Sequence, residues 1–196
     1  VWIVDDDRSI RWVLERALTQ AGIKVRSFES ADALLKHLER ERPRAIISDV
    51  RMPGTDGFTL LERLNAHFPG LPVIIMTAYA DLDRAVAAYQ GGAFEYLPKP
   101  FDIDEAVTIV QRAVRRQPEQ PKTPEVSAET LAAEIIGSAP PMQEVFRAIG
   151  RLSRSNMTVL LTGESGTGKE LVARALHRHS PRAAESFIAL NTAAIP

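Results

Sequence analysis

The sequence predicts an α/β protein in which a five-stranded, doubly wound parallel sheet is followed by a linker and a truncated second α/β domain. Two observations predict the first domain. Over residues 1–116, five short apolar runs alternate with five stretches of helical periodicity. Each run is continuous rather than alternating, which is typical of strands that helices cover on both faces of a parallel sheet. A third observation, a glycine-rich loop at residues 163–169 between an apolar run and a helical pattern, predicts the second domain.

The apolar runs are the expected strands, and helices are expected between them. Gly22 is placed to end the first helix in a left-handed conformation, and Ser30 to cap the second. The fourth helix is expected to run from near Asp81 to Gly91-Gly92. Five such β/α repeats indicate a doubly wound sheet of the flavodoxin-like kind. The expected strands are residues 1–4, 24–28, 44–49, 72–77 and 94–98.

A change in composition separates the two expected domains. The first domain occupies 1–116, and residues 117–133 then carry prolines among charged side chains with little apolar surface to bury. We expect a semi-rigid linker there and the truncated second domain at 134–196. The elements expected in the second domain are a helix that begins at Pro140-Pro141, a strand at 158–162, a helix from Glu170 to His179 and a strand at 187–190.

Composition and charge exclude several classes of function. Lys plus Arg is 24 and Asp plus Glu is 25, so the net charge of −1 shows no basic excess of the kind that favours nucleic acid. No apolar run approaches the roughly 20 residues that span a bilayer, and no secretory leader is recognisable. Without cysteine, disulfides and thiolate metal sites are excluded. We expect a cytoplasmic protein with no membrane partner and, because the chain has no initiator Met, a fragment.

Polar residues follow four of the apolar runs, at the point where each expected strand ends. They are Asp5-Asp6, Asp49, Thr77 and Lys99. Because the carboxyl ends of parallel strands meet at one edge of a sheet, we expect these side chains to lie close together. Carboxylates, a hydroxyl and an ammonium gathered there suit a divalent cation and a phosphoryl group.

The acidic part of this cluster predicts a Mg²⁺ site. Mg²⁺ prefers oxygen ligands and keeps several waters, so one or two carboxylates and a backbone carbonyl suffice. Asp6 and Asp49 are the expected direct ligands, together with the backbone carbonyl of Arg51. Asp5 is expected to bind through water. Clustered carboxylates repel one another without a cation, which also favours a metal.

Asp49 is the expected nucleophile of the cluster. A carboxylate can form an aspartyl phosphate by in-line attack, and the metal and the Lys99 ammonium would neutralise charge on the transferring oxygens. Thr77 is then expected to donate its hydroxyl to a phosphoryl oxygen.

Each of these residues also has an ordinary structural explanation. Asp7, and also Asp6, could cap the first helix, while Asp49 could form a turn and Lys99 could be a surface charge. The conjunction of acids, a hydroxyl and a Lys-Pro pair after four different strands favours the site. The register stays open, because Asp6 with Asp7 could stand in place of Asp5 with Asp6.

The loop at 163–169 fits the phosphate-binding pattern G-x-x-x-x-G-K. Its glycines let backbone N–H groups approach phosphates, and Lys169 would reach the β and γ oxygens. Glu170 departs from the general pattern, because Ser or Thr usually stands there and binds magnesium. The expected ATP-binding residues are Gly163, Glu164, Ser165, Gly166, Thr167, Gly168, Lys169 and Glu170.

Residues 1–116 resemble the receiver domain of bacterial two-component response regulators. The strings that carry the resemblance are Val-Asp-Asp-Asp, Ser-Asp-Val-Arg-Met-Pro-Gly-Thr-Asp-Gly, Ile-Met-Thr-Ala and Leu-Pro-Lys-Pro-Phe-Asp. The resemblance implies that Asp49 accepts phosphate from a sensor histidine kinase. It also implies that Asp5 and Asp6 hold Mg²⁺.

The same resemblance implies a conformational switch. Thr77, Tyr96 and Lys99 would sense the phosphate, and the bond between Lys99 and Pro100 would be cis. Phosphate on Asp49 would pull Thr77 inward, let Tyr96 rearrange and reshape the fourth helix.

The second domain resembles the AAA+ ATPases that activate sigma-54 RNA polymerase. Its Walker A string is Gly-Glu-Ser-Gly-Thr-Gly-Lys-Glu, and Ile-Ile-Gly-Ser and Phe-Ile-Ala-Leu-Asn belong to the same resemblance. A receiver joined to this ATPase is the layout of NtrC-type response regulators. The resemblance implies ATP and Mg²⁺, an NtrB-like sensor histidine kinase, and sigma-54 RNA polymerase and DNA bound through parts absent from this chain. It also implies a receiver-mediated dimer and an ATPase ring.

We therefore expect a phosphorylation-controlled transcription regulator, at nitrogen-assimilation genes, rather than a metabolic enzyme. The full-length protein is expected to be an ATPase and this piece to be inactive, because no Walker B acids follow Lys169. Two alternatives stay open: a generic P-loop ATPase with an appended regulatory module, and a Mg²⁺-dependent phosphoryl-transfer enzyme. Arg51 weakens the second, because such hydrolases carry another acid at that position.

Overall fold

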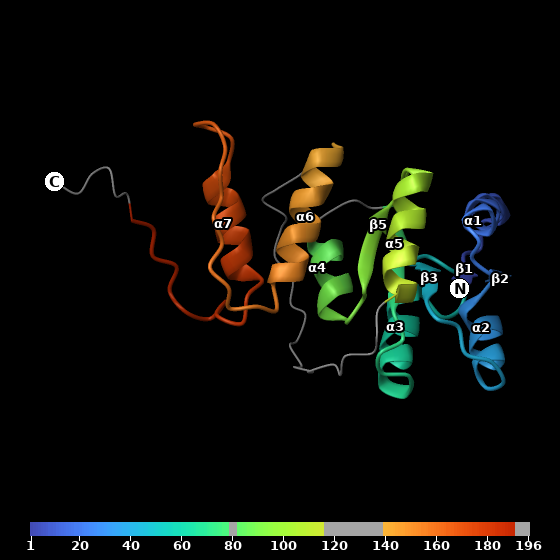
Figure 1. Cartoon of the computed structure of the whole chain (residues 1–196). Helices are drawn as coiled ribbons and strands as arrows, with labels where there is room; N and C mark the ends of the chain where they lie inside the picture. The colour runs from blue at the N-terminus through green and yellow to red at the C-terminus, as the bar shows by residue number, and fades with distance from the viewer. Residues whose placement is uncertain (79–81, 116–138, 191–196) are drawn as a thin grey trace.

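Five parallel strands form a single sheet in the computed structural model, which describes residues 1–78, 82–115 and 139–190 (Figure 1). The strand order is β2-β1-β3-β4-β5, and every neighbouring pair is parallel. This is the order of a doubly wound sheet, as the β/α repeats predict. The strands are β1 (Trp2–Val4), β2 (Arg26–Phe28), β3 (Ile46–Asp49), β4 (Val73–Thr77) and β5 (Glu95–Pro98).

Helices cover both faces of the sheet, and alternate side chains of each strand pack against one layer or the other. Ile3 and Ile47 pack against α1 and α5, whereas Trp2, Val4 and Ile46 pack against α2, α3 and α4. The continuous apolar runs are therefore explained by burial on both sides. These helices are α1 (Arg8–Gln20), α2 (Ala31–Leu38), α3 (Gly57–His67), α4 (Leu82–Gln90) and α5 (Ile103–Arg115).

Side-chain caps set where three of these helices begin. Ser30 accepts a hydrogen bond from the Ala33 N–H, as expected. Asp7 caps α1 and Asp56 caps α3 in the same way. The strands predicted at 24–28, 44–49 and 94–98 begin one or two residues later than expected. The structure describes α4 from Leu82 onward, and the start predicted near Asp81 lies outside the described residues.

The second part of the chain contains α6 (Pro140–Leu152) and α7 (Lys169–Arg178) and extends from the α4 side of the sheet (Figure 1). Both helices were predicted, although α7 begins and ends one residue earlier than expected. The linker predicted at 117–133 lies outside the described residues.

The two strands predicted for this second part are wrong. Residues 158–162 and 187–190 have no strand conformation, and Leu160 and Ile188 are 86% and 76% exposed. A strand is stabilised when a neighbour satisfies its N–H and C=O groups. In the part of the chain that the structure describes, no strand lies beside either segment.

Candidate functional site

A lysine and two carboxylates meet at the carboxyl edge of the sheet. Lys99 Nζ lies 2.7 Å from Asp5 Oδ2 and 2.7 Å from Asp49 Oδ1. Asp5 and Asp49 are only 1% and 5% exposed; Asp5 directly follows β1, and Asp49 is the last residue of the neighbouring strand β3. The structure therefore brings together three of the residues that the sequence places at this edge.

Backbone groups hold these side chains in position. The Asp7 N–H donates to Asp5 Oδ1 at 2.9 Å, and the Arg51 N–H donates to Asp49 Oδ2 at 2.7 Å. The Lys99 N–H donates to the Thr77 carbonyl at 2.7 Å. The Lys99–Pro100 peptide bond is cis, as expected. Each carboxylate thus keeps one oxygen on a backbone amide and turns the other toward Lys99.

The pKa values of both Asp5 and Lys99 are raised, each by a different balance of burial and hydrogen bonding. Burial raises the pKa of Asp5, and the hydrogen bond from Lys99 only partly opposes that increase. Burial alone would lower the pKa of Lys99, but hydrogen bonds to Asp49 and Asp5 outweigh it and raise the pKa. Lys99 is therefore a permanent cation at physiological pH, positioned to neutralise an anion on Asp49.

Only some of the oxygen donors expected for Mg²⁺ lie close together: Asp5 and Asp49 both contact Lys99. Asp6 is exposed and lines a surface hollow of about 620 Å³ together with Arg51, Asp56 and Arg84. Within the described ranges, no three acidic or histidine side chains converge closely enough to hold a metal by themselves. The donor chemistry fits Mg²⁺ nonetheless, because this ion binds through one or two carboxylates and retains waters.

The other residues predicted for the receiver site lie in or next to the strands of the sheet. Thr77 is the last residue of β4 and is buried. Tyr96 is fully buried, in the apolar cluster that also contains Leu82 and Val86 of α4. Asp7 caps α1 through the Ser9 N–H, so its structural explanation is confirmed.

Gly57 is a residue of the site that the sequence analysis missed. A Cβ atom added there would lie 2.1 Å from the carbonyl oxygen of Asp49. The Gly57 N–H also donates to the Val50 carbonyl at 2.9 Å. The first turn of α3 therefore lies directly against the backbone of Asp49. A glycine immediately after the capping residue Asp56 was the available signal.

The phosphate loop directly precedes α7, as predicted, although the described residues just before the loop form no strand. Gly163, Gly166 and Gly168 have φ angles of 154°, 81° and 84°, in the region that favours glycine. Lys169 Nζ donates to the Gly163 carbonyl at 3.0 Å and folds back over the loop. Glu170 pairs with Arg174, one turn along α7, at 2.8 Å. All of these groups lie at or near the surface of the second part.

Comparison with known families separates the same two parts. The response regulator receiver domain family matches residues 1–111, more than half of the chain. The chain belongs to this family. The sigma-54 interaction domain matches residues 135–196, which contain α6, the phosphate loop and α7. The receiver is thus followed by a sigma-54 activation region, the arrangement of an NtrC-type response regulator.

The chain is similar over its whole length to curated NtrC regulators. It is 62% identical to the DNA-binding transcriptional regulator NtrC of Klebsiella pneumoniae over 195 residues. It is 61% identical to that of Escherichia coli K12 over 196 residues. Both comparisons cover 100% of this chain and 42% of the relative. The chain therefore spans less than half the length of these regulators.

Solved structures support the receiver fold and the order of the two parts. The BeF3-activated receiver domain of nitrogen regulatory protein C is 59% identical, with a TM-score of 0.51, and the match covers 58% of this chain and 91% of that one. NtrX from Brucella abortus in complex with ATP is 29% identical, with a TM-score of 0.55, over 100% of this chain and 43% of that one. Among the described residues, no helix is both long and apolar enough to cross a membrane.

Proposed function

We propose that Asp49 is the phosphoacceptor of this receiver and that its donor is a phosphohistidine of an NtrB-like sensor kinase. The observation that carries the proposal is the position of Lys99 Nζ, 2.7 Å from both Asp49 and Asp5. A buried carboxylate beside a permanent cation is prepared to accept a group that adds negative charge.

The transfer requires only one bond to form and one to break. An oxygen of Asp49 attacks phosphorus as the phosphorus–nitrogen bond of the donor breaks, and the imidazole nitrogen takes up a proton from solvent. Lys99 neutralises charge on the phosphoryl oxygens, and Thr77 donates its hydroxyl to one of them. The Arg51 N–H, which already donates to Asp49, keeps the carboxylate oriented during the attack.

We propose that Asp6, Asp49 and the carbonyl of Arg51 hold Mg²⁺ directly and that Asp5 holds it through water. The three carboxylates and Lys99 leave two negative charges in excess, which a dication balances. When bound, Mg²⁺ supplies charge neutralisation at the phosphoryl group.

The switch is proposed to run from Thr77 to Tyr96 and α4. Lys99 and Thr77 are joined by a backbone hydrogen bond, and Tyr96 shares an apolar cluster with α4. A displacement of Thr77 toward phosphate would therefore change the space available to Tyr96, and the packing of α4 would change with it.

The second part is proposed to bind ATP through residues 163–170, with Lys169 at the terminal phosphates. The positive φ angles of its glycines and its place before α7 support this proposal. In the full-length protein, we propose a cytoplasmic regulator with a receiver-mediated dimer and an ATPase ring. Its partners would be sigma-54 RNA polymerase and DNA at nitrogen-assimilation genes.

Intact mass tests the phosphoacceptor directly. The chain is incubated with Mg²⁺ and a small acyl phosphate, and wild type is compared with Asp49→Asn and with the surface control Asp104→Asn. We expect one phosphoryl adduct in the wild type and the control and none in Asp49→Asn. An adduct that survives Asp49→Asn would remove the proposed role and favour a generic P-loop ATPase with an appended module.

A further inference from the structure

Arg11 of α1 contacts the acidic segment, residues 5–7, which connects β1 to α1. One of its guanidinium nitrogens, Nη1, donates to the Asp5 carbonyl at 2.6 Å and to the Asp6 carbonyl at 3.1 Å. Both acceptors are backbone groups of residues proposed to hold Mg²⁺. A single donor therefore fixes the peptide groups on both sides of the Asp6 Cα atom.

The direction of the Asp6 side chain depends on these two peptide groups. Asp6 is exposed, and among the described residues its carboxylate makes no hydrogen bond. Asp5 differs, because its carboxylate is buried and accepts hydrogen bonds from Lys99 and from the Asp7 N–H. Peptide groups are planar, so the two planes that flank a Cα atom set the direction of its side chain. The contacts of Arg11 thus fix the point from which the Asp6 carboxylate extends.

Helix stability does not explain a cation in the first turn of α1. The partial positive charge at the start of a helix favours acidic side chains there. The first turns of α2, α4 and α5 contain acidic residues, whereas that of α1 contains none and carries Arg8 and Arg11 instead. The bonds from Arg11 to the Asp5 and Asp6 carbonyls offset this unfavourable placement.

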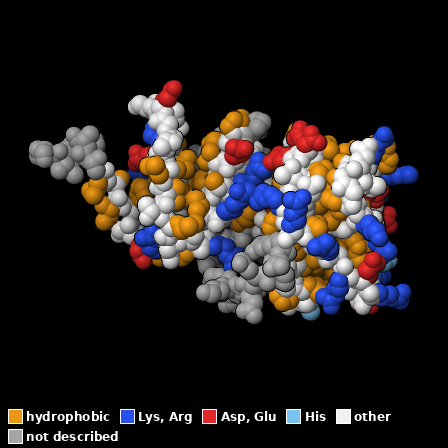
Figure 2. All heavy atoms as spheres, viewed as in Figure 1, with side chains coloured by type: hydrophobic (Ala, Val, Ile, Leu, Met, Phe, Trp, Pro, Cys, Tyr) orange, Lys and Arg blue, Asp and Glu red, His pale blue; other side chains and the backbone are white. Residues whose placement is uncertain are grey.

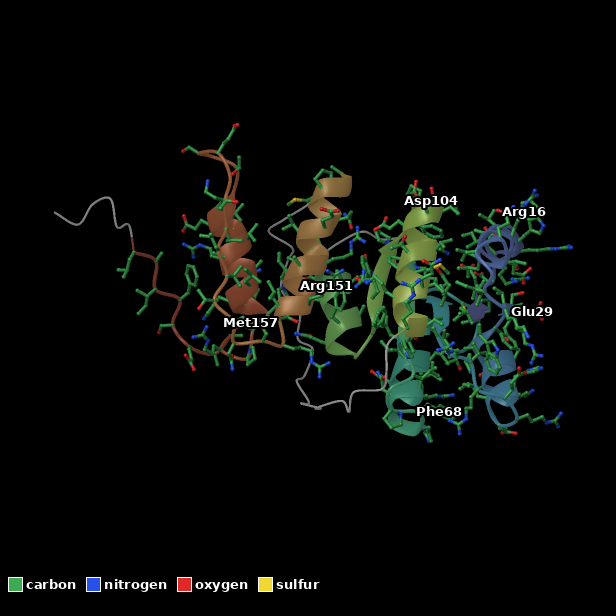
Figure 3. The ribbon with its side chains drawn as sticks, in the orientation of Figure 1. Arg16, Glu29, Phe68, Asp104, Arg151 and Met157 are labelled. Atoms are coloured by element: carbon green, nitrogen blue, oxygen red, sulfur yellow. The ribbon has the colours of Figure 1, made fainter. Side chains whose placement is uncertain are left out.

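The other basic residues of α1 do not make this contact. The helix carries Arg8, Arg11 and Arg16, and Figure 2 shows Lys and Arg side chains at this end of the molecule. Arg16, labelled in Figure 3, is exposed, and its guanidinium lies over the Trp12 ring. Arg8 is also exposed, and among the described residues it has no hydrogen-bond or ion-pair partner. Of these three side chains, only Arg11 donates to the acidic segment.

We propose that Arg11 is a positioning residue for the Mg²⁺ site, which holds the Asp6 carboxylate in its binding direction through the Asp5 and Asp6 carbonyls. The inference rests on the proposed function, in which Asp6 and Asp49 hold Mg²⁺. Arg11 itself touches neither the ion nor the phosphoryl group. It reduces the reorganisation of Asp6 on binding, and outer partners of this kind typically contribute about 10–100-fold in metal affinity.

Charge and positioning predict opposite effects on Mg²⁺ affinity. A guanidinium near the site repels a dication, so its removal should strengthen Mg²⁺ binding if only its charge matters. If Arg11 positions Asp6, its removal should weaken binding, because ordering Asp6 then consumes part of the binding free energy. The sign of the change therefore distinguishes a positioning residue from a nearby charge.

The test is a titration of Mg²⁺ alone into the full chain, with the amide NMR shifts of Asp6 and Asp7 reporting the dissociation constant. We expect Arg11→Met to weaken binding about ten-fold relative to wild type. Arg11→Lys should restore most of the affinity, because both bonds come from one nitrogen and an ammonium also offers several donors. Tighter or unchanged binding in Arg11→Met would overturn the proposal.

Arg8→Met is the matched control. It removes the same charge from the same helical turn, but it removes no bond to the acidic segment. Its Mg²⁺ affinity should equal that of wild type or be slightly higher. A loss as large as that of Arg11→Met would overturn the positioning role, because the carbonyl contact could not then be its cause. Urea unfolding verifies that each variant is folded at the titration temperature.

The order of the acidic segment is tested separately, without metal, through hydrogen exchange of the Asp7 amide. This N–H donates to Asp5 Oδ1, so it is protected while the segment keeps its shape. We expect at least about five-fold faster exchange in Arg11→Met than in Arg8→Met, Arg11→Lys or wild type. Equal exchange in all four would overturn the positioning by Arg11. If wild type shows no saturable Mg²⁺ shift, the proposed metal site fails instead, while amide exchange still decides whether Arg11 orders the segment.

Discussion

The charge cluster around Asp49 and the phosphate loop illustrate two different relations between sequence and structure. Around Asp49, β1, β3, β4 and β5 pair with one another and bring side chains from distant parts of the chain within 2.7 Å. Around Lys169, α7 follows the glycine-rich loop as predicted, but the flanking segments 158–162 and 187–190 are not strands.

The difference shows that a motif's local geometry does not require its sheet. Positive φ angles at Gly166 and Gly168 and the start of α7 depend on residues close in the sequence. A strand depends on a neighbour that supplies hydrogen-bond partners and covers its apolar side chains. The receiver part has those neighbours among its described residues, whereas segment 158–162 has none.

The largest difference between the two regions is expected for apolar substitutions. One substitution lies in a strand of the receiver, and the other lies in the segment 158–162, which was predicted as a strand but is not one. Ile47→Ala in β3 should lower the free energy of unfolding by about 2–5 kcal/mol, because Ile47 is buried between the sheet and α1 and α5. Leu160→Ala should change it by less than about 0.5 kcal/mol, because Leu160 is exposed. Urea unfolding followed by circular dichroism measures both. Equal losses would contradict the contrast between the regions.

The second largest difference in stability is expected between glycine substitutions in the receiver and in the phosphate loop. Gly57→Ala forces a Cβ against the backbone of Asp49 and should cost about 1–3 kcal/mol of global stability. Gly166 also has a positive φ, but no atom lies within 4 Å of an added Cβ. Gly166→Ala should therefore strain only its loop and leave the main urea transition in place. A shift of that transition as large as that of Gly57→Ala would show that the loop is part of the receiver's cooperative unit.

The charge cluster should show a pH-dependent effect of intermediate size. Lys99→Met leaves Asp5 and Asp49 without their counter-charge and should cost about 2 kcal/mol at pH 7. Burial raises the pKa of Asp5 above its ordinary value near 4, so the folded chain binds this proton more tightly than the unfolded chain. The contribution of Asp5 protonation to the free energy of unfolding therefore increases as the pH falls through the folded-state pKa toward 4.

The loss in Lys99→Met should accordingly be smaller at pH 5 than at pH 7 in urea unfolding, relative to wild type at each pH. Lys36→Met, which alters an exposed lysine of α2, should differ little from wild type at either pH. If Lys99→Met lost the same free energy of unfolding at pH 5 and at pH 7, protonation of Asp5 could not be what reduces the loss at low pH.

The smallest effects are expected at the helix starts. Asp56 caps α3 through the Phe58 and Thr59 N–H groups, so Asp56→Ala should cost about 1 kcal/mol. Glu170→Ala removes an exposed pair with Arg174 in the first turn of α7 and should cost about 0.5 kcal/mol or less. Thermal unfolding of the two variants against wild type measures this difference, and a larger loss for Glu170→Ala would contradict it.

Most of the receiver fold and the composition of its charge cluster could be predicted from the sequence. Continuous apolar runs identified the strands, and Ser30 and Gly22 marked helix ends that the structure confirms. Asp5, Asp49 and Lys99 could be grouped because parallel strands end at a common edge. The contact of Gly57 with the Asp49 backbone could not be predicted, since it depends on how closely α3 approaches β3.

By itself, the sequence determined the local features of this chain: the helix caps, the left-handed glycines of the phosphate loop, and the order of strands and helices in the receiver. These features depend on residues a few positions apart. Only the tertiary structure decided which predicted strands pair, how Lys99 divides its hydrogen bonds between Asp5 and Asp49, and where Arg151 meets Glu95. The physical reason is that pairing, burial and charge compensation depend on groups that are distant in the chain and become neighbours only when it folds.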